Sequence, residues 1–162
     1  MTWTAPKTDW TTGELIAADD MNAIGENLAA LNNQKATAIY TTTESIFATS
    51  SSRSFVDVDS ANLSLTITTT GGDVMVHLLA TGHRHDNSDR VHMLFDIDVD
   101  GNRQGGDNGL ARMSLDQAYS QNLSFTYIVQ DLDPGSHTFK LQWKGGGMGR
   151  MQAGAQFWVR EI

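Results

Sequence analysis

Two hydrophobic patterns divide the chain near residue 36. Before it, apolar side chains recur every three or four positions over residues 18–34, which predicts one amphipathic helix. After it, apolar and polar side chains alternate, as they do in half-buried β-strands. The clearest alternating runs are residues 63–67, 91–99, 123–129, 139–143 and 151–159. We therefore predict a mainly β protein, an antiparallel jelly-roll sandwich of about 8–10 strands preceded by an extended arm and one α-helix.

This change of pattern also predicts two domains. Residues 1–36 would form an N-terminal arm and helix for attachment or trimerisation, and residues 37–162 would form the jelly-roll head. The arm carries Trp3 and Trp10, and two tryptophans are costly to leave in water. They either fold back on the head or anchor the arm to another protein.

Four apolar side chains form a narrow seam along the predicted helix: Met21, Ile24, Leu28 and Leu31. Their spacing is the a/d pattern of a coiled coil. A helix of this length is marginal by itself in water. The seam therefore packs either on its own domain or in a short parallel bundle with copies of itself.

Residues 74–80 depart from strict alternation because both faces of this strand are apolar. Such a strand is expected either between two sheets or beneath a neighbouring subunit. The pattern favours oligomerisation.

Composition narrows the classes of function. The chain has 11 Lys+Arg against 19 Asp+Glu, a net charge of -8, and an acidic surface repels nucleic acid. It has no cysteine, which excludes disulfides and thiolate metal sites. It has no apolar run of the roughly 20 residues that span a bilayer, and its N-terminus lacks the pattern of a signal peptide. We expect a soluble protein without nucleic-acid or membrane partners.

A row of aspartates, Asp96, Asp98 and Asp100, is a candidate cation site. With the following Gly101, its spacing partly mimics an EF-hand calcium loop. However, Arg103 stands where that loop has an apolar residue, and no helices flank it. In the second interpretation, which we favour, the aspartates face solvent, the apolar residues between them face the core, and a hairpin turn follows.

His83 and His85 lie two residues apart, so they share one face of a strand and could bind a transition metal. We favour ordinary polar surface or interface positions for both and predict no cofactor. The chain has no Gly-x-Ser-x-Gly elbow and no phosphate-binding glycine loop that opens a helix. We therefore do not expect an enzyme.

Three aromatic residues, Tyr119, Trp143 and Trp158, are candidates for stacking on a sugar or for burial in a subunit interface. Trp158 is out of phase with its apolar neighbours, so it should face outward or into such an interface. We favour the interface because tryptophan is a preferred anchor there.

The segment from Thr2 to Leu31 resembles the N-terminal signature of a group of tailed-bacteriophage virion proteins. In that pattern a tryptophan and a Gly-Glu pair, here Gly13-Glu14, precede a helix start of small residues. An asparagine and then an Asn-Leu pair follow, here Asn22 and Asn27-Leu28. The threonine typical of the helix start is Ala17 in this chain.

The C-terminal part resembles the jelly-roll heads of the tumour necrosis factor and complement-head type, which phages also use. The resembling segments are residues 132–143, with a Pro-Gly turn before an alternating strand, and the terminal strand at 157–162. The resemblance implies homotrimers, with strand residues lining the central axis and the N-terminal helices gathered below.

Together these features predict a non-enzymatic phage virion structural protein. It would be a homotrimeric accessory attached to other virion proteins by its N-terminal arm, as a capsid decoration protein or a small tail or fibre component. The alternative is a receptor-binding head that recognises a host-surface glycan. The expected location is the particle surface or the tail. The residues predicted for attachment and the trimer interface are Trp3, Trp10, Met21, Ile24, Leu28 and Leu31.

Overall fold

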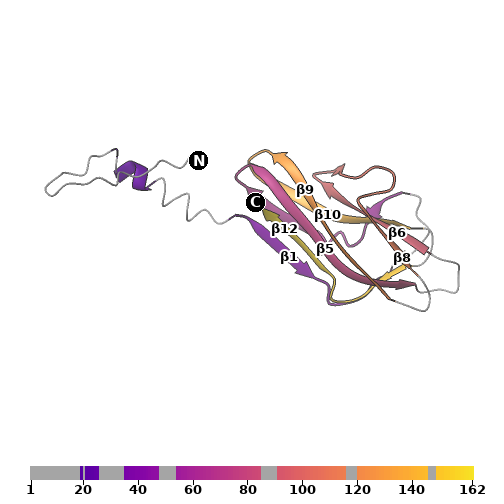
Figure 1. Cartoon of the computed structure of the whole chain (residues 1–162). Helices are drawn as coiled ribbons and strands as arrows, with labels where there is room; N and C mark the ends of the chain where they lie inside the picture. The colour runs from indigo at the N-terminus through magenta and orange to yellow at the C-terminus, as the bar shows by residue number, and fades with distance from the viewer. Residues whose placement is uncertain are drawn as a thin grey trace. The chain divides into compact units, whose positions relative to one another are not determined.

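A computed structural model of the chain describes residues 19, 21–25, 35–47, 54–84, 91–115, 120–145 and 149–162 (Figure 1). The chain forms two compact units, Met1–Gln34 and Lys35–Ile162. In the first unit the described residues are helical and lie within the predicted helix. Met21 and Ile24, from the predicted seam, are exposed. The other predicted attachment residues, Trp3, Trp10, Leu28 and Leu31, lie outside the described residues.

The described part of the second unit is built from strands joined by turns, as the alternating pattern predicts. Three of the strands have only two residues, which explains why the total exceeds the predicted number. In chain order they are β1 (Thr37–Thr41), β2 (Ile46–Phe47), β3 (Val56–Asp57), β4 (Ser64–Thr69), β5 (Gly72–Arg84), β6 (Val91–Val99), β7 (Asn102–Arg103), β8 (Ala111–Leu115), β9 (Gln121–Leu132), β10 (Gly135–Gly145), β11 (Gly149–Met151) and β12 (Gln156–Glu161).

The strands form two antiparallel sheets. In the first, which we call the β5 sheet, β1, β12, β5 and β9 are neighbours in that order (Figure 1). In the same sheet β11 pairs with β5, and β2 pairs with β11. In the second, the β10 sheet, β3 and β4 pair with β10, β10 pairs with β6, and β6 pairs with β7 and β8. The chain crosses from one sheet to the other between β2 and β3, β4 and β5, β5 and β6, β8 and β9, β9 and β10, and β10 and β11. This antiparallel crossing pattern is that of a jelly roll.

The core lies between the two sheets and is filled by the inward half of each alternating run. Along β5, for example, Val74, Val76 and Leu78 are fully buried. Leu79 points the other way and is 43% exposed. Of the two alternatives for this doubly apolar strand, a place between two sheets is therefore wrong.

No helix among the described residues is long and apolar enough to cross a membrane.

Candidate functional site

The outward face of the β5 sheet carries large apolar side chains and few charges. The strand register aligns its side chains in three rows across β1, β12, β5 and β9. These rows are Thr37–Arg160–Met75–Ile128, Ile39–Trp158–His77–Thr126 and Thr41–Gln156–Leu79–Ser124. We call these twelve residues the β5 face.

Large apolar side chains on the β5 face are open to solvent. Ile39 is 60% exposed and Ile128 is 44% exposed. Trp158 is half-buried, and its ring lies 5.0 Å from the His77 ring, centroid to centroid. Thr126 Oγ1 lies 2.9 Å from His77 Nδ1 and so fixes the imidazole. Trp158 faces outward, as its phase in the sequence predicted.

The β5 face also differs from the rest of the surface in charge. Its one permanently charged side chain is Arg160, and it contains no Asp or Glu. The outward face of the β10 sheet is polar in contrast. There Thr66 and Thr138 share a hydrogen bond of 2.9 Å, and Asp57 accepts one of 2.9 Å from Gln142. The twelve residues of the β5 face thus contain no carboxylate, although the chain as a whole is acidic.

The aspartate row of β6 is buried, so the prediction that Asp96 and Asp98 face solvent is wrong. Asp96 is 0% exposed and Asp98 is 6% exposed. Ile97 and Val99 do face the core, as predicted. The aspartates are covered because residues 100–110 fold back over the outward face of β6.

Backbone groups of that loop bind the buried carboxylates. Asp96 Oδ1 accepts hydrogen bonds of 2.8 Å from the N–H of Gly105 and from the N–H of Ile97. Asp98 Oδ1 accepts one of 3.0 Å from the N–H of Gly101. The loop approaches so closely that a Cβ on Gly109, which has φ +65°, would lie 2.4 Å from the carbonyl oxygen of Phe95. The glycines at 105 and 109, where an added Cβ would lie less than 3 Å from another atom, were the sequence signal for this packing.

Arg103 closes the site above Asp96. Its Nε lies 3.5 Å from Asp96 Oδ2, and its guanidinium lies 4.4 Å from the centroid of the Phe55 ring. Burial raises the pKa of Asp96, and the two backbone N–H groups and Arg103 oppose that rise. The carboxylate therefore holds the loop in place.

The candidate metal ligands are not gathered into one site. Asp100 lies in the turn after β6 and bonds to His137 and to the N–H of Thr138, away from Asp96. His83 Nδ1 lies 3.1 Å from Gln152 Nε2, and His85 is outside the described residues. No group of three or more His, Asp or Glu that could hold a metal occurs in the described part of the chain.

Sequence reasoning missed a hydrogen-bonded cluster around His137. Its Nδ1 lies 2.7 Å from Asp100 Oδ2, and its Nε2 lies 2.8 Å from the carbonyl oxygen of Asp133. The hydrogen bond to Asp100 and then the Asp133 carbonyl raise the pKa of His137. Both ring nitrogens face acceptors, so only the doubly protonated imidazolium satisfies both. The cluster joins the turn after β6 to the turn before β10.

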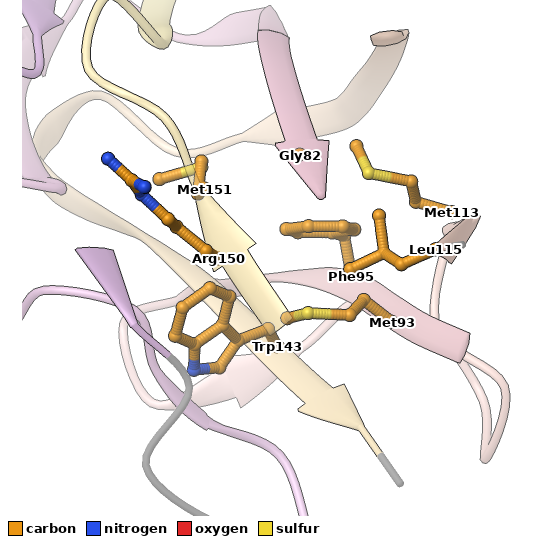
Figure 2. A pocket seen from close by; sticks show the side chains of 8 residues that line it. All are labelled: Gly82, Met93, Phe95, Met113, Leu115, Trp143, Arg150 and Met151. Atoms are coloured by element: carbon orange, nitrogen blue, oxygen red, sulfur yellow. The ribbon is translucent and has the colours of Figure 1, made fainter. Parts of the chain in front are cut away.

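Figure 2 shows an apolar space inside one end of the sandwich. Its lining residues are Gly82, Met93, Phe95, Met113, Leu115, Trp143, Arg150 and Met151. The space is too narrow for a water molecule. Trp143 is 4% exposed and packs with its ring centroid 6.4 Å from that of Phe95, so its predicted role as an interface or glycan contact is wrong. Tyr119 lies outside the described residues.

The described strands define a β-sandwich of the jelly-roll class. No protein-family model and no curated protein matches the chain. Among solved structures, the head is similar to the VP2 subviral particle of infectious bursal disease virus, with a TM-score of 0.47 and 11% identity over 79% of this chain and 33% of that one. It is also similar to a chain in the structure of the Gt strain of that virus, with a TM-score of 0.45 and 8% identity over 79% of this chain and 32% of the other.

A third similar structure is Eiger TNF from S. frugiperda, with a TM-score of 0.42 and 8% identity. The match covers 80% of this chain and 94% of that one. This chain spans about a third of the length of these two viral chains. Similar structures therefore include a viral capsid protein and a protein of the tumour necrosis factor type. The resemblance of the N-terminal segment to tailed-phage virion proteins stays a prediction.

Proposed function

We propose that this chain is a non-enzymatic structural protein of a tailed-phage particle, which works as a homotrimer attached by its N-terminal arm. The observation that carries the proposal is the exposed, carboxylate-free β5 face. Such a face is what an acidic protein needs for association with copies of itself.

The apolar side chains of the β5 face cost free energy while they are in contact with water. Soluble monomers rarely expose contiguous apolar patches of more than a few hundred Å². On the β5 face, Ile39, Leu79 and Ile128 are all exposed. They lie on β1, β5 and β9, and β12 joins β1 to β5 in the same sheet. Covering them with a second copy removes this apolar area from water.

The net charge of the chain also favours association through the β5 face. Two copies that each carry a net charge of -8 repel one another over most of their surface. They approach at least cost through a face without carboxylates, which the β5 face provides. The outward face of the β10 sheet, with Asp57 and Lys140 in an ion pair of 3.7 Å, is suited to solvent instead.

The exposed seam of the N-terminal helix favours a cyclic assembly. Met21 and Ile24 lie exposed at the spacing of a coiled-coil seam. A parallel bundle of such helices requires a cyclic arrangement of the copies, because all N-termini then lie at the same end of one axis. The helix seam is therefore a second candidate contact between copies, beside the β5 face.

The ionisable groups described above have structural partners, which supports a role without catalysis. Asp96 is bound by a loop, His137 joins two turns, and Glu161 accepts hydrogen bonds from Thr70 Oγ1 and N–H at 2.6 and 2.9 Å. None of these arrangements leaves an activated nucleophile beside a free base, which acyl or glycosyl transfer requires.

The test is the mass of the full chain in solution, measured by light scattering and native mass spectrometry. We expect a trimer for the wild type and dissociation for Leu79→Asp, which places a charge on the β5 face. Thr68→Asp is the matched control, since Thr68 is an exposed strand residue on the β10 sheet. A monomeric wild type, or a Leu79→Asp protein that stays trimeric, would overturn the proposal.

The attachment role is tested on intact particles. Imaging of a labelled chain locates it on capsid or tail, and removal of residues 1–15 should abolish binding to the particle while the head stays folded. If the shortened chain still decorates the particle, the arm does not attach it.

A second candidate function is recognition of a host-surface glycan, favoured by the Trp158–His77 pair with Thr126 beside it. An aromatic ring beside hydrogen-bonding groups can stack on a sugar. A glycan array with wild-type and Trp158→Ala protein tests this function. Binding that Trp158→Ala abolishes without dissociating the trimer would favour it, because sugar and subunit would otherwise compete for one face.

A further inference from the structure

Arg160 and Asp131 are two exposed side chains of opposite charge at the β5 sheet. Arg160 lies in an outer row of the β5 face, near the end of β12, and Asp131 lies near the end of β9. The backbone N–H of Asp131 donates to Asp73 Oδ1 at 3.1 Å, and Asp131 has a positive φ of 53°.

The two charges cannot meet within one copy. In the register, Arg160 lies opposite Met75 on β5, and Met75 lies opposite Ile128 on β9. The two strand spacings between β12 and β9 amount to about 9–10 Å. Asp131 lies three residues beyond Ile128, which adds about 10 Å along the strand.

Strand β9 presents the edge that complements the β5 face. Among the described strands it pairs with β5 on one side, so its other edge is open over Gln121–Leu132. This edge contains no lysine, arginine or proline, the residues that commonly protect an edge from association. Its one charged residue is Asp131, an acid, and the one permanent charge of the β5 face is Arg160, a base.

We propose that, in the assembled protein, the β9 edge of one copy packs against the β5 face of the next, so that Asp131 pairs with Arg160 across each interface. This inference rests on the proposed self-association and names its geometry. A cyclic assembly joins two different patches of each copy, which an edge and a face provide.

Electrostatics favours this pairing over a purely apolar contact. An arginine covered by a subunit without an opposite charge loses its hydration with no compensation. A carboxylate from the neighbouring copy restores that energy and also fixes the register of the two copies. The open β9 edge offers one such carboxylate.

Charge reversal tests the pair in the full chain. We expect Arg160→Glu and Asp131→Arg each to raise the concentration at which the assembly half-dissociates by at least about tenfold, or about 1.4 kcal/mol. The double variant should regain most of the wild-type affinity, because the pair is then re-formed with reversed charges. Arg112→Glu and Asp107→Arg, at exposed positions on β8 and in the loop before it, are the matched controls. Circular dichroism checks that each variant is folded.

The outcomes separate the two proposals. If the wild type is a monomer, both the proposed assembly and this pairing fail. If the wild type assembles and the single reversals behave like the controls, the pairing is wrong and the proposed function stands. The pairing is also overturned if the losses of association free energy from the two single reversals add up in the double variant, because two residues in contact must show an interaction energy.

Discussion

Replacement of His137 by glutamine should lower stability in a way that depends on pH. His137 donates to both Asp100 Oδ2 and the Asp133 carbonyl only when it carries two ring protons. Its side chain is 13% exposed, whereas that of Asp100 is 43% exposed and is screened by solvent. Hydrogen bonds to charged groups contribute about 1.5–3 kcal/mol, and with that screening we expect a loss of about 1–2 kcal/mol in the variant.

The sign of the pH effect follows from the direction of the pKa shift. The hydrogen bond to Asp100 raises the pKa of His137 in the folded chain above its ordinary value. The stabilisation is therefore complete below the unfolded pKa and is lost as pH rises through the folded pKa. Wild type and His137→Gln should differ most near about pH 5.5 and least near about pH 9.

Urea unfolding followed by circular dichroism at several pH values measures this difference, at one fixed protein concentration because association adds to stability. An NMR titration of the imidazole reports its pKa directly. His92→Gln is the control, since His92 Nδ1 lies 3.0 Å from the hydroxyl of Ser114 and forms no ion pair with a carboxylate among the described residues. If the difference in the free energy of unfolding between wild type and His137→Gln is the same at every pH from about 5.5 to about 9, the pH effect does not come from His137.

Two further predictions concern the loop over Asp96 and the end of β12. Gly109→Ala should destabilise the head by about 2 kcal/mol or more, because the residue has φ +65° and the new Cβ would clash with the Phe95 carbonyl. Thermal unfolding measures this loss, and Gly106→Ala is the control because a Cβ at that position meets no other atom. Glu161 is 1% exposed; burial opposes its ionisation, but hydrogen bonds from Thr70 and the charge of Lys35 hold its pKa below the usual value. Glu161→Gln should therefore cost about 1–3 kcal/mol at neutral pH, and the cost should vanish as pH falls through the folded pKa. If the free energies of unfolding of the wild type and Glu161→Gln fall in parallel as the pH is lowered, this prediction is contradicted.

The alternation of side chains predicted the strands and most of their faces. It placed Ile97 and Val99 in the core and Trp158 on the outside, and it showed that both faces of β5 are apolar. This success has a physical basis, because the side-chain period of a strand is fixed by its backbone. The same rule was available for Trp143, which continues the inward run of Phe139 and Leu141. Treating it as a surface aromatic ignored its phase.

Burial of Asp96 and Asp98 was not available from alternation. Their phase correctly places them on the outward side of β6, but it does not say what covers that side. The cover is a loop held by backbone hydrogen bonds from Gly105 and Gly101, which form only once the chain has turned back. The His137 cluster was missed for the same reason, since it joins residues far apart in sequence.

The four methionines in the described part of the head lie in two environments, and they can serve as chemical reporters. Met93, Met113 and Met151 are at most 4% exposed around a space with no room for water, so an oxidant reaches their sulfur only when that end of the sandwich opens. Met75 lies on the β5 face and is partly exposed in the single chain. Peptide mapping after brief peroxide treatment would therefore read two processes at once: sulfoxide at Met75 reports separation of subunits, and sulfoxide at the three buried positions reports local unfolding.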